Sequence, residues 1–164
     1  MHGSIMQKLS NLVFPEDCTC ALCDKECEQN AHGLCPDCAK AVVVCARIPQ
    51  VEYVDEVRAG ILYAGAVHEG MYRFKYHGAR YLAKFFAQYM NIPDGWQIDA
   101  IIPVPLYKEK ERARGYNQCA LLAEKLSLKS HIPVRTDFLL RVRDTVPQFG
   151  LSSQERAQNV KGAF

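Results

Sequence analysis

The sequence predicts an α/β fold preceded by a small cysteine-rich metal module. Three observations lead to this prediction. Seven of the eight cysteines fall between Cys18 and Cys45, short apolar runs alternate with amphipathic segments after residue 50, and turn residues separate them. A strand–helix–strand order is typical of a sheet flanked by helices. We therefore divide the 164 residues into a zinc-ribbon-like module at 1–50 and a second domain at 51–164.

The composition agrees with an ordinary globular protein. The chain is 49% hydrophobic and 23% charged, and a net charge of +2 is too small to indicate nucleic-acid binding by itself. Residues 1–10 lack the apolar stretch of a signal peptide, and no run approaches the ~20 apolar residues of a membrane span. We therefore expect a cytoplasmic protein without a membrane span, whose cysteines stay reduced.

Two CxxC pairs dominate the first module. They are separated by eleven residues and consist of Cys20 with Cys23 and Cys35 with Cys38. A tight turn brings the sulfurs at positions i and i+3 together, and four thiolates suit a tetrahedral zinc ion with Zn–S distances of about 2.3 Å. A closed site of this kind does no chemistry and stabilises a segment too small to bury its own core.

Other uses of the cysteines compete with a zinc site. A redox dithiol needs one CxxC pair only, and the strand–helix setting typical of such a pair is absent from the sequence. Free buried thiols would leave the paired spacing unexplained. Cys18, Cys27 or Cys45 could replace one of the four predicted ligands. Cys119 lies on the apolar face of a predicted helix and is expected to be a small core residue.

The first half of the second domain begins with a predicted strand at residues 57–63. Apolar residues then recur at steps of three and four over residues 67–89, which predicts an amphipathic helix with Gly70 and Gly78 as points where it can break. A turn at residues 93–95 closes this unit.

The second half repeats the pattern. Residues 99–105 predict a buried parallel strand that ends at two prolines, and residues 133–142 predict another strand. Between them a helix follows Asn117, its expected N-cap. Residues 151–156 predict the start of a further helix. The apolar face of the helix that follows Asn117 consists of Cys119, Leu122, Ala123 and Leu126.

A basic loop is predicted between the strand at 99–105 and the helix after Asn117. Ligands of open α/β sheets bind where strands end, and a helix N-terminus favours anions. Gly115 would let the backbone approach a phosphate closely. The alternative is a solvated loop in which Glu109 and Glu111 balance part of the charge. The basic residues are Lys108, Lys110, Arg112 and Arg114.

Several motifs follow one another in an order that resembles the ComF family of competence-associated proteins. They occupy residues 12–15, 74–78, 102–106, 114–118, 141–148 and 151–164. The resemblance covers nearly the whole chain. It implies an N-terminal double zinc ribbon followed by a type I phosphoribosyltransferase-like parallel sheet with helices.

The resemblance also implies a site for phosphoribosyl pyrophosphate (PRPP) with Mg²⁺, although no catalytic residue can be named. Its pyrophosphate would lie against Arg112, Arg114, Gly115, Tyr116, Asn117 and Gln118. A flexible hood would contribute Arg141, Arg143, Gln148, Arg156 and Asn159.

The family pattern continues with a loop of two adjacent acidic residues and a Thr-Thr-Gly-x-Thr run, which this sequence does not contain. Since those residues hold the ribose and its 5-phosphate, we expect a truncated chain with an incomplete sheet and an unpaired edge. Ordinary PRPP binding and transferase activity should then be lost.

The resemblance associates the chain with natural competence and DNA uptake. A second interpretation is a non-catalytic module that binds single-stranded nucleic acid or a helicase-type competence protein. Aromatic residues interleaved with basic ones suit single strands, although these aromatics fall partly on the apolar helix face, and purely structural linkage is a third possibility. The interleaved residues are Arg73, Phe74, Lys75, Tyr76, Arg80, Tyr81, Lys84 and Phe85.

Overall fold

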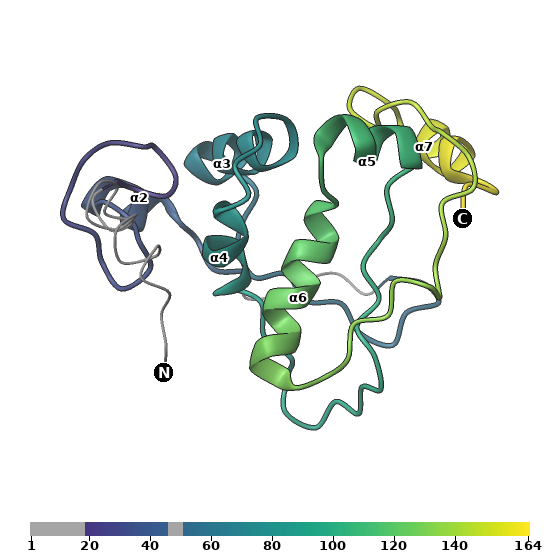
Figure 1. Ribbon diagram of the computed structural model, residues 1–164, viewed down its shortest axis with the longest axis horizontal. Coiled ribbons are helices and arrows are strands. Elements are labelled where there is room, and N and C mark those ends of the chain that lie inside the picture. Colours follow the sequence, from purple (N-terminus) through teal and green to yellow (C-terminus); the bar gives the residue numbers. More distant parts are fainter. Residues whose placement is uncertain (1–18, 46–50) are drawn as a thin grey trace, which may run out of the picture. The chain divides into compact units, whose positions relative to one another are not determined.

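The computed structural model describes residues 19–45 and 51–164, and Figure 1 shows their course. None of the helices in these residues is long and apolar enough to cross a membrane. Figure 1 labels the helices, which are α2 (Pro36–Ala41), α3 (Gly65–Tyr76), α4 (Leu82–Ala87), α5 (Lys108–Arg114), α6 (Gln118–Ser130) and α7 (Ser153–Val160).

The chain divides into two compact units. Unit 1 comprises Met1–Arg73 with Gln88–Met90, and unit 2 comprises Phe74–Ala87 with Asn91–Phe164. The change from unit 1 to unit 2 thus falls inside α3. The predicted boundary at residue 50 lies outside the described residues, as do Cys18 and the motif at 12–15, so the predicted domain limits stay a prediction.

The predicted strands do not form in the part of the chain that the structure describes. Of residues 57–63 only Ile61 makes a bridge, antiparallel to Val44, and Ile101 and Val134 form one parallel bridge. Around that bridge the backbone bonds run from Ile101 N to Pro133 O and from Arg135 N to Ile101 O, both 2.9 Å long. A strand extends only where a neighbour supplies further partners, so the parallel sheet is not confirmed.

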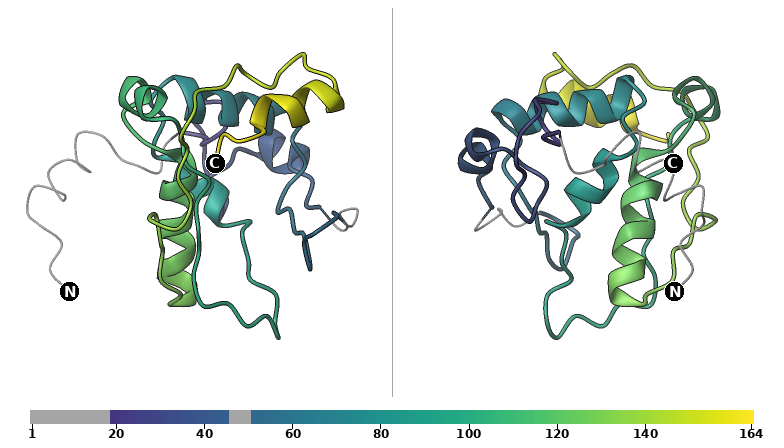
Figure 2. Two further views of the ribbon diagram at one scale, coloured as in Figure 1. Left: turned by 90° about the vertical axis from the view of Figure 1, so that its right-hand side faces the viewer. Right: turned by 60° about the vertical axis from the view of Figure 1, so that its left-hand side comes forward.

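Unit 2 has a small aromatic core. α4 packs against α6, as Figures 1 and 2 show. Phe74 and Leu82 are fully buried, and the Phe74 and Phe86 rings stack with centroids 5.7 Å apart. The helix predicted over residues 67–89 is broken into α3 and α4, because Gly78 takes a left-handed φ of 68° that ends α3.

The predicted basic loop is wrong in its conformation, because residues 108–114 form helix α5. Lys, Glu, Arg and Ala are all strong helix formers, and α5 ends at Gly115, whose N–H bonds to the Glu111 carbonyl at 2.7 Å. The N-cap prediction for α6 is confirmed: the Asn117 side chain accepts from Cys119 N. α7 begins after Ser152 with a capping box to Glu155.

Candidate functional site

Four cysteine sulfurs gather in unit 1. The Sγ atoms of Cys20, Cys23, Cys35 and Cys38 lie within 4.8 Å of one another. The Cys23 and Cys35 sulfurs are 3.8 Å apart, and a tetrahedron with metal–sulfur bonds of about 2.3 Å has edges of about 3.8 Å. All but Cys23 are buried. The four predicted ligands therefore lie together at a spacing that fits a metal ion.

Backbone hydrogen bonds hold the first CxxC turn. Asp24 N donates to Cys20 O at 2.9 Å, and Cys20 N donates to Lys25 O at 2.8 Å. Asp24 adopts a left-handed φ of 57°, which reverses the chain after the turn. The second turn opens α2, where the Cys35 sulfur accepts from Cys38 N at 3.4 Å. Each pair is thus set by local structure, as the spacing predicted.

The cluster favours a cation electrostatically. Burial alone would raise the pKa of the Cys20 thiol, but backbone N–H groups of Cys35, Cys23 and Leu22 lower that pKa to about 6. Burial and the neighbouring sulfurs raise the pKa of Cys38. Adjacent thiolates repel each other, so a divalent cation is needed for all four to ionise together.

The remaining cysteines lie outside this four-sulfur group. Burial raises the pKa of Cys27, and the charges of the nearby sulfurs add to the effect. Cys45 is half-buried, and Cys18 lies outside the described residues. Burial also raises the pKa of Cys119, although its side chain is half-buried and not in the core as expected. Within the described part of the chain, the four predicted cysteines complete the cluster without Cys27 or Cys45.

Three of the six residues predicted to bind pyrophosphate anchor the turn between α5 and α6. The Gly115 carbonyl accepts from Arg80. Tyr116 is 6% exposed, and its hydroxyl donates to the Phe74 carbonyl. Asn117, 8% exposed, donates to the Val104 carbonyl at 3.0 Å. Protein partners therefore occupy these groups.

The other three lie on the helices that flank this turn, and two of them, Arg114 and Gln118, are half-buried. The Arg114 guanidinium donates to Gln118 and lies 5.2 Å from the centroid of the Tyr76 ring. Arg112 is exposed on α5. The structure thus brings Arg114 and Gln118 together, whereas anion binding by this set stays a prediction.

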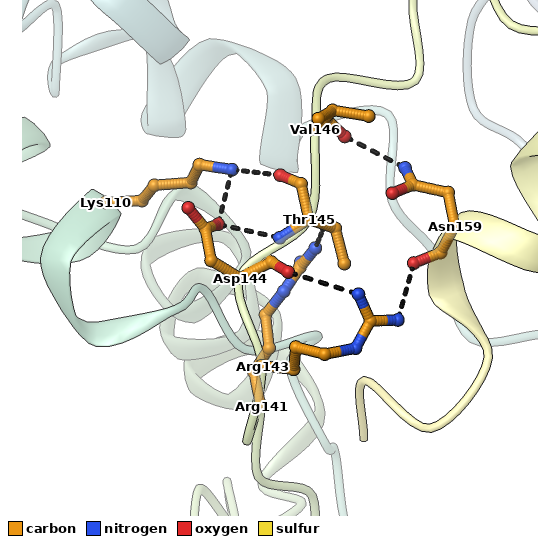
Figure 3. Close-up of polar contacts among 7 residues, drawn as sticks. All are labelled: Lys110, Arg141, Arg143, Asp144, Thr145, Val146 and Asn159. Carbon is orange, nitrogen blue, oxygen red and sulfur yellow. Dashed lines mark hydrogen bonds and ion pairs between the residues drawn. The ribbon is translucent and has the colours of Figure 1, made fainter.

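A polar network connects α5 with the segment predicted as a hood (Figure 3). Lys110 Nζ lies 2.6 Å from the Asp144 carboxylate and also donates to the Thr145 carbonyl. Arg141 donates to the Thr145 hydroxyl. The hydrogen bond from Lys110 holds the pKa of Asp144 below its usual range. The segment is therefore tied to α5 by charge.

The same segment is tied to the end of α7. Arg143 donates to the carbonyls of Asn159 and Lys161 at 3.0 and 2.8 Å, and the Asn159 side chain donates to Val146 O at 2.9 Å. Three of the five predicted hood residues, Arg141, Arg143 and Asn159, therefore belong to one network (Figure 3). The other two, Gln148 and Arg156, are exposed.

The aromatic residues proposed for stacking on single strands divide into two groups. Phe74 and Phe85 are 0% and 2% exposed, so the stacking interpretation is wrong for both. Tyr76 and Tyr81 are 60% and 57% exposed. This division agrees with the expectation that the aromatic residues fall partly on the apolar helix face.

Sequence reasoning missed two structural contacts. Arg73 was grouped with nucleic-acid contacts, but its guanidinium donates to carbonyls of the first CxxC turn. The Lys110–Asp144 pair joins residues far apart in sequence. Neither contact has a local sequence signal, because both depend on tertiary structure.

Curated proteins with similar sequences are known. "Competence protein F" of Haemophilus influenzae is 38% identical over 100 residues, which cover 56% of this chain and 44% of that protein. "Competence protein ComFC" of Bacillus subtilis is 33% identical over 121 residues, 70% of this chain and 48% of that protein. "DNA utilization protein YhgH" of Escherichia coli O157:H7 is 39% identical over 66 residues, 40% of this chain and 29% of that protein.

The chain spans less than half the length of these relatives. No family model matches the sequence. No solved structure matches the chain either.

Proposed function

Because the chain is a ComF-family protein, we propose that it takes part in competence-type DNA uptake as a zinc-stabilised module that contacts single-stranded DNA. The names of its relatives refer to competence and DNA utilization. The cysteine cluster and an exposed tyrosine–arginine surface support the physical part of this proposal.

The observation that carries the DNA proposal is a tyrosine–arginine patch in unit 2, which comprises Tyr76, Tyr81, Arg80 and Arg114. Both tyrosines are more than half exposed, and Arg114 lies over the Tyr76 ring. Nucleobases stack on exposed aromatic rings whatever their sequence, while arginines neutralise the phosphates between them. Both kinds of contact suit a single strand, whose bases are free to stack.

Zinc is the metal we propose for the cysteine cluster. Thiolate ligands and tetrahedral spacing favour it over the hard cations Mg²⁺ and Ca²⁺. The ion would hold the two CxxC turns together and would carry out no reaction. A cytoplasmic location would keep the four thiols reduced and available to the ion.

Fluorescence anisotropy with labelled oligo(dT) tests the DNA proposal. We expect zinc-loaded protein to bind the single strand better than a duplex of equal length, with affinity falling as salt rises. Each of Tyr76→Ala and Tyr81→Ala should weaken binding by about 5- to 150-fold, since base stacking contributes about 1–3 kcal/mol per ring. Tyr53→Ala is the matched control, because Tyr53 is 95% exposed in unit 1.

An unchanged affinity in both patch variants contradicts the proposed surface. Loss of equal size in Tyr53→Ala points to non-specific contact instead. If wild-type protein binds no oligo(dT), DNA contact by this chain is wrong.

Binding of a pyrophosphate group is a second proposal. The parallel Ile101–Val134 bridge, with α5 and α6 between its two residues, supports it, because α/β proteins bind anions beyond the ends of parallel strands. The sequence contains no acidic pair followed by a Thr-Thr-Gly-x-Thr run, so inorganic pyrophosphate with Mg²⁺ is the suitable probe. Calorimetric titration of wild-type protein with this probe should release or absorb heat, and Arg112→Ala should reduce that heat. If wild-type protein gives no binding heat, the pyrophosphate proposal is wrong.

A further inference from the structure

Arg73 connects α3 to the first CxxC turn within unit 1. Its side chain is only 22% exposed. The guanidinium donates to the Ala21 carbonyl at 2.9 Å and to the Leu22 carbonyl at 2.8 Å, and it also pairs with the Asp24 carboxylate. The two carbonyls belong to the residues between Cys20 and Cys23. One side chain therefore holds the turn at three points.

The two carbonyls that Arg73 binds belong to the same peptide groups that face the Cys20 sulfur. The N–H groups of Leu22 and Cys23 act on that sulfur and lower the pKa of the Cys20 thiol. In a trans peptide the C=O and N–H bonds point in opposite directions. The peptide whose oxygen is Ala21 O carries the Leu22 N–H, and the peptide whose oxygen is Leu22 O carries the Cys23 N–H. Arg73 thus grips each peptide on the side opposite the sulfur.

This arrangement has two physical consequences. Fixing the oxygen end of a peptide also fixes the direction of its N–H, so both donors stay aimed at the sulfur. Chains of hydrogen bonds also polarise one another, and a positive charge at the oxygen end strengthens donation at the other end. Four thiolates around Zn²⁺ carry a net charge of −2, which a nearby guanidinium partly offsets.

We propose that Arg73 is a positioning residue of the metal centre, which holds the Ala21–Leu22 and Leu22–Cys23 peptides in the orientation that keeps Cys20 bound to the ion. This inference rests on the proposed zinc site and adds a residue outside the CxxC pairs to it. Groups that orient metal ligands without touching the metal typically change metal affinity by about 10- to 100-fold.

The test compares zinc release from the whole chain in wild type, Arg73→Ala and Arg73→Lys. Transfer of zinc to a chromogenic chelator gives the release rate. We expect Arg73→Ala to release zinc about 10- to 100-fold faster. Arg73→Lys keeps the charge but cannot form the same fork of bonds, so we expect release to be several-fold faster. Arg58→Ala is the control, because Arg58 is 56% exposed and pairs only peripherally with Glu56.

A second measurement separates positioning from general stability. Cobalt bound to four thiolates shows absorption bands that depend on ligand geometry, and we expect these bands to shift in Arg73→Lys. If Arg73→Ala fails to fold, the comparison of Arg73→Lys and Asp24→Asn with wild type still tests the inference. Asp24→Asn removes the charge of one partner, and we expect it to speed zinc release less than Arg73→Lys does.

The outcomes distinguish the two proposals. If wild-type protein holds no stoichiometric zinc or cobalt, the metal function itself is wrong. If wild type holds the metal but Arg73→Lys matches it in release rate and cobalt spectrum, the positioning role is wrong. A release rate in Arg58→Ala equal to that of Arg73→Ala also overturns the inference.

Discussion

At the scale of single residues, Asn117 combines two tasks in one buried side chain. Its oxygen caps α6 by accepting from Cys119 N at 2.9 Å, and its amide donates to Val104 O at 3.0 Å. We expect Asn117→Ala to lower the free energy of unfolding by about 1–3 kcal/mol, because it removes the cap and leaves a carbonyl without its donor. Asn117→Ser keeps a capping oxygen and should lose less.

Urea denaturation followed by the fluorescence of Trp96, the one tryptophan in the sequence, measures both variants, since Trp96 and Asn117 both lie in unit 2. Asn91→Ala, at an exposed position in the same unit, is the control and should change the free energy of unfolding by less than about 0.5 kcal/mol. Equal stability of the Ala and Ser variants would show that the cap contributes nothing.

Gly115 ends α5 in a conformation that other residues resist. Its φ is 81°, and a Cβ there would lie 3.1 Å from Arg80 Nη2. We expect Gly115→Ala to cost about 1–2 kcal/mol of unfolding free energy from backbone strain, with an added cost because Arg80 must shift. Gly78→Ala is the matched control: φ is 68°, and nothing lies within 4 Å of its Cβ site. In the same urea assay, a smaller loss in Gly115→Ala than in Gly78→Ala would contradict the Arg80 contact.

At the scale of elements, the helices with clear N-cap residues could be predicted from the sequence, and strands could not. A helix closes its hydrogen bonds within the segment, so Asn117 and Ser152 mark the starts of α6 and α7 locally. The CxxC spacing likewise located the cysteine cluster, because each pair of sulfurs is brought together by a local turn. A strand depends on its neighbours, and the predicted strand at residues 99–105 is reduced to one bridge at Ile101. The basic segment 108–114 was misassigned because charge alone does not separate a loop from an exposed helix.

The link between α5 and the segment before α7 is electrostatic. Asp144→Asn removes the partner of Lys110, and we expect faster hydrogen exchange in residues 141–146. The increase should be a few-fold at most, because exposed ion pairs stabilise weakly. Glu109→Gln, which neutralises another exposed α5 pair, is the control. An unchanged exchange rate in Asp144→Asn would show that hydrogen bonds to the backbone hold the segment without the charge.

The pH dependence of this link has a defined sign. Lys110 lowers the pKa of Asp144 in the folded protein, so the ion pair stabilises the segment at pH above the ordinary carboxyl pKa of about 3.9. That stabilisation is lost as the pH falls through the lowered folded value. Exchange protection of residues 141–146, corrected for intrinsic rates, should therefore approach that of Asp144→Asn in acid. A difference between the two proteins that persists well below that pKa would contradict the ion pair.

At the scale of the whole molecule, apolar side chains of the predicted strands are exposed. Ile102 and Val104 are 44% and 51% exposed, and Leu140 and Val142 are 61% and 67% exposed. The sequence pattern predicted burial because apolar runs of this kind usually lie inside a sheet. A strand is buried only where other helices or strands pack over it, and the pattern within one segment does not show whether they do. The helical packing of unit 2 could be predicted only in part, through Phe74, Leu82 and Phe85.

The two units should respond differently to metal removal, because their cores are built from different residues. In the described part of the cysteine module, the buried side chains are those of Leu22, Leu34 and three of the four sulfur ligands. A segment this small needs the metal to stay folded. Unit 2 instead buries Phe74, Phe85 and Phe86 with no sulfur ligand among them.

We therefore expect a chelator to abolish exchange protection over residues 19–42 while α6 and the Trp96 fluorescence stay as in the zinc-loaded protein. Cys20→Ser should reproduce the effect without a chelator, because loss of one thiolate opens the tetrahedral set. Cys119→Ala is the control, since Cys119 lies in unit 2 and should leave the zinc stoichiometry unchanged. Hydrogen exchange measured by mass spectrometry resolves both regions in one experiment. Loss of protection in α6 together with residues 19–42 would mean that the metal supports the fold as a whole.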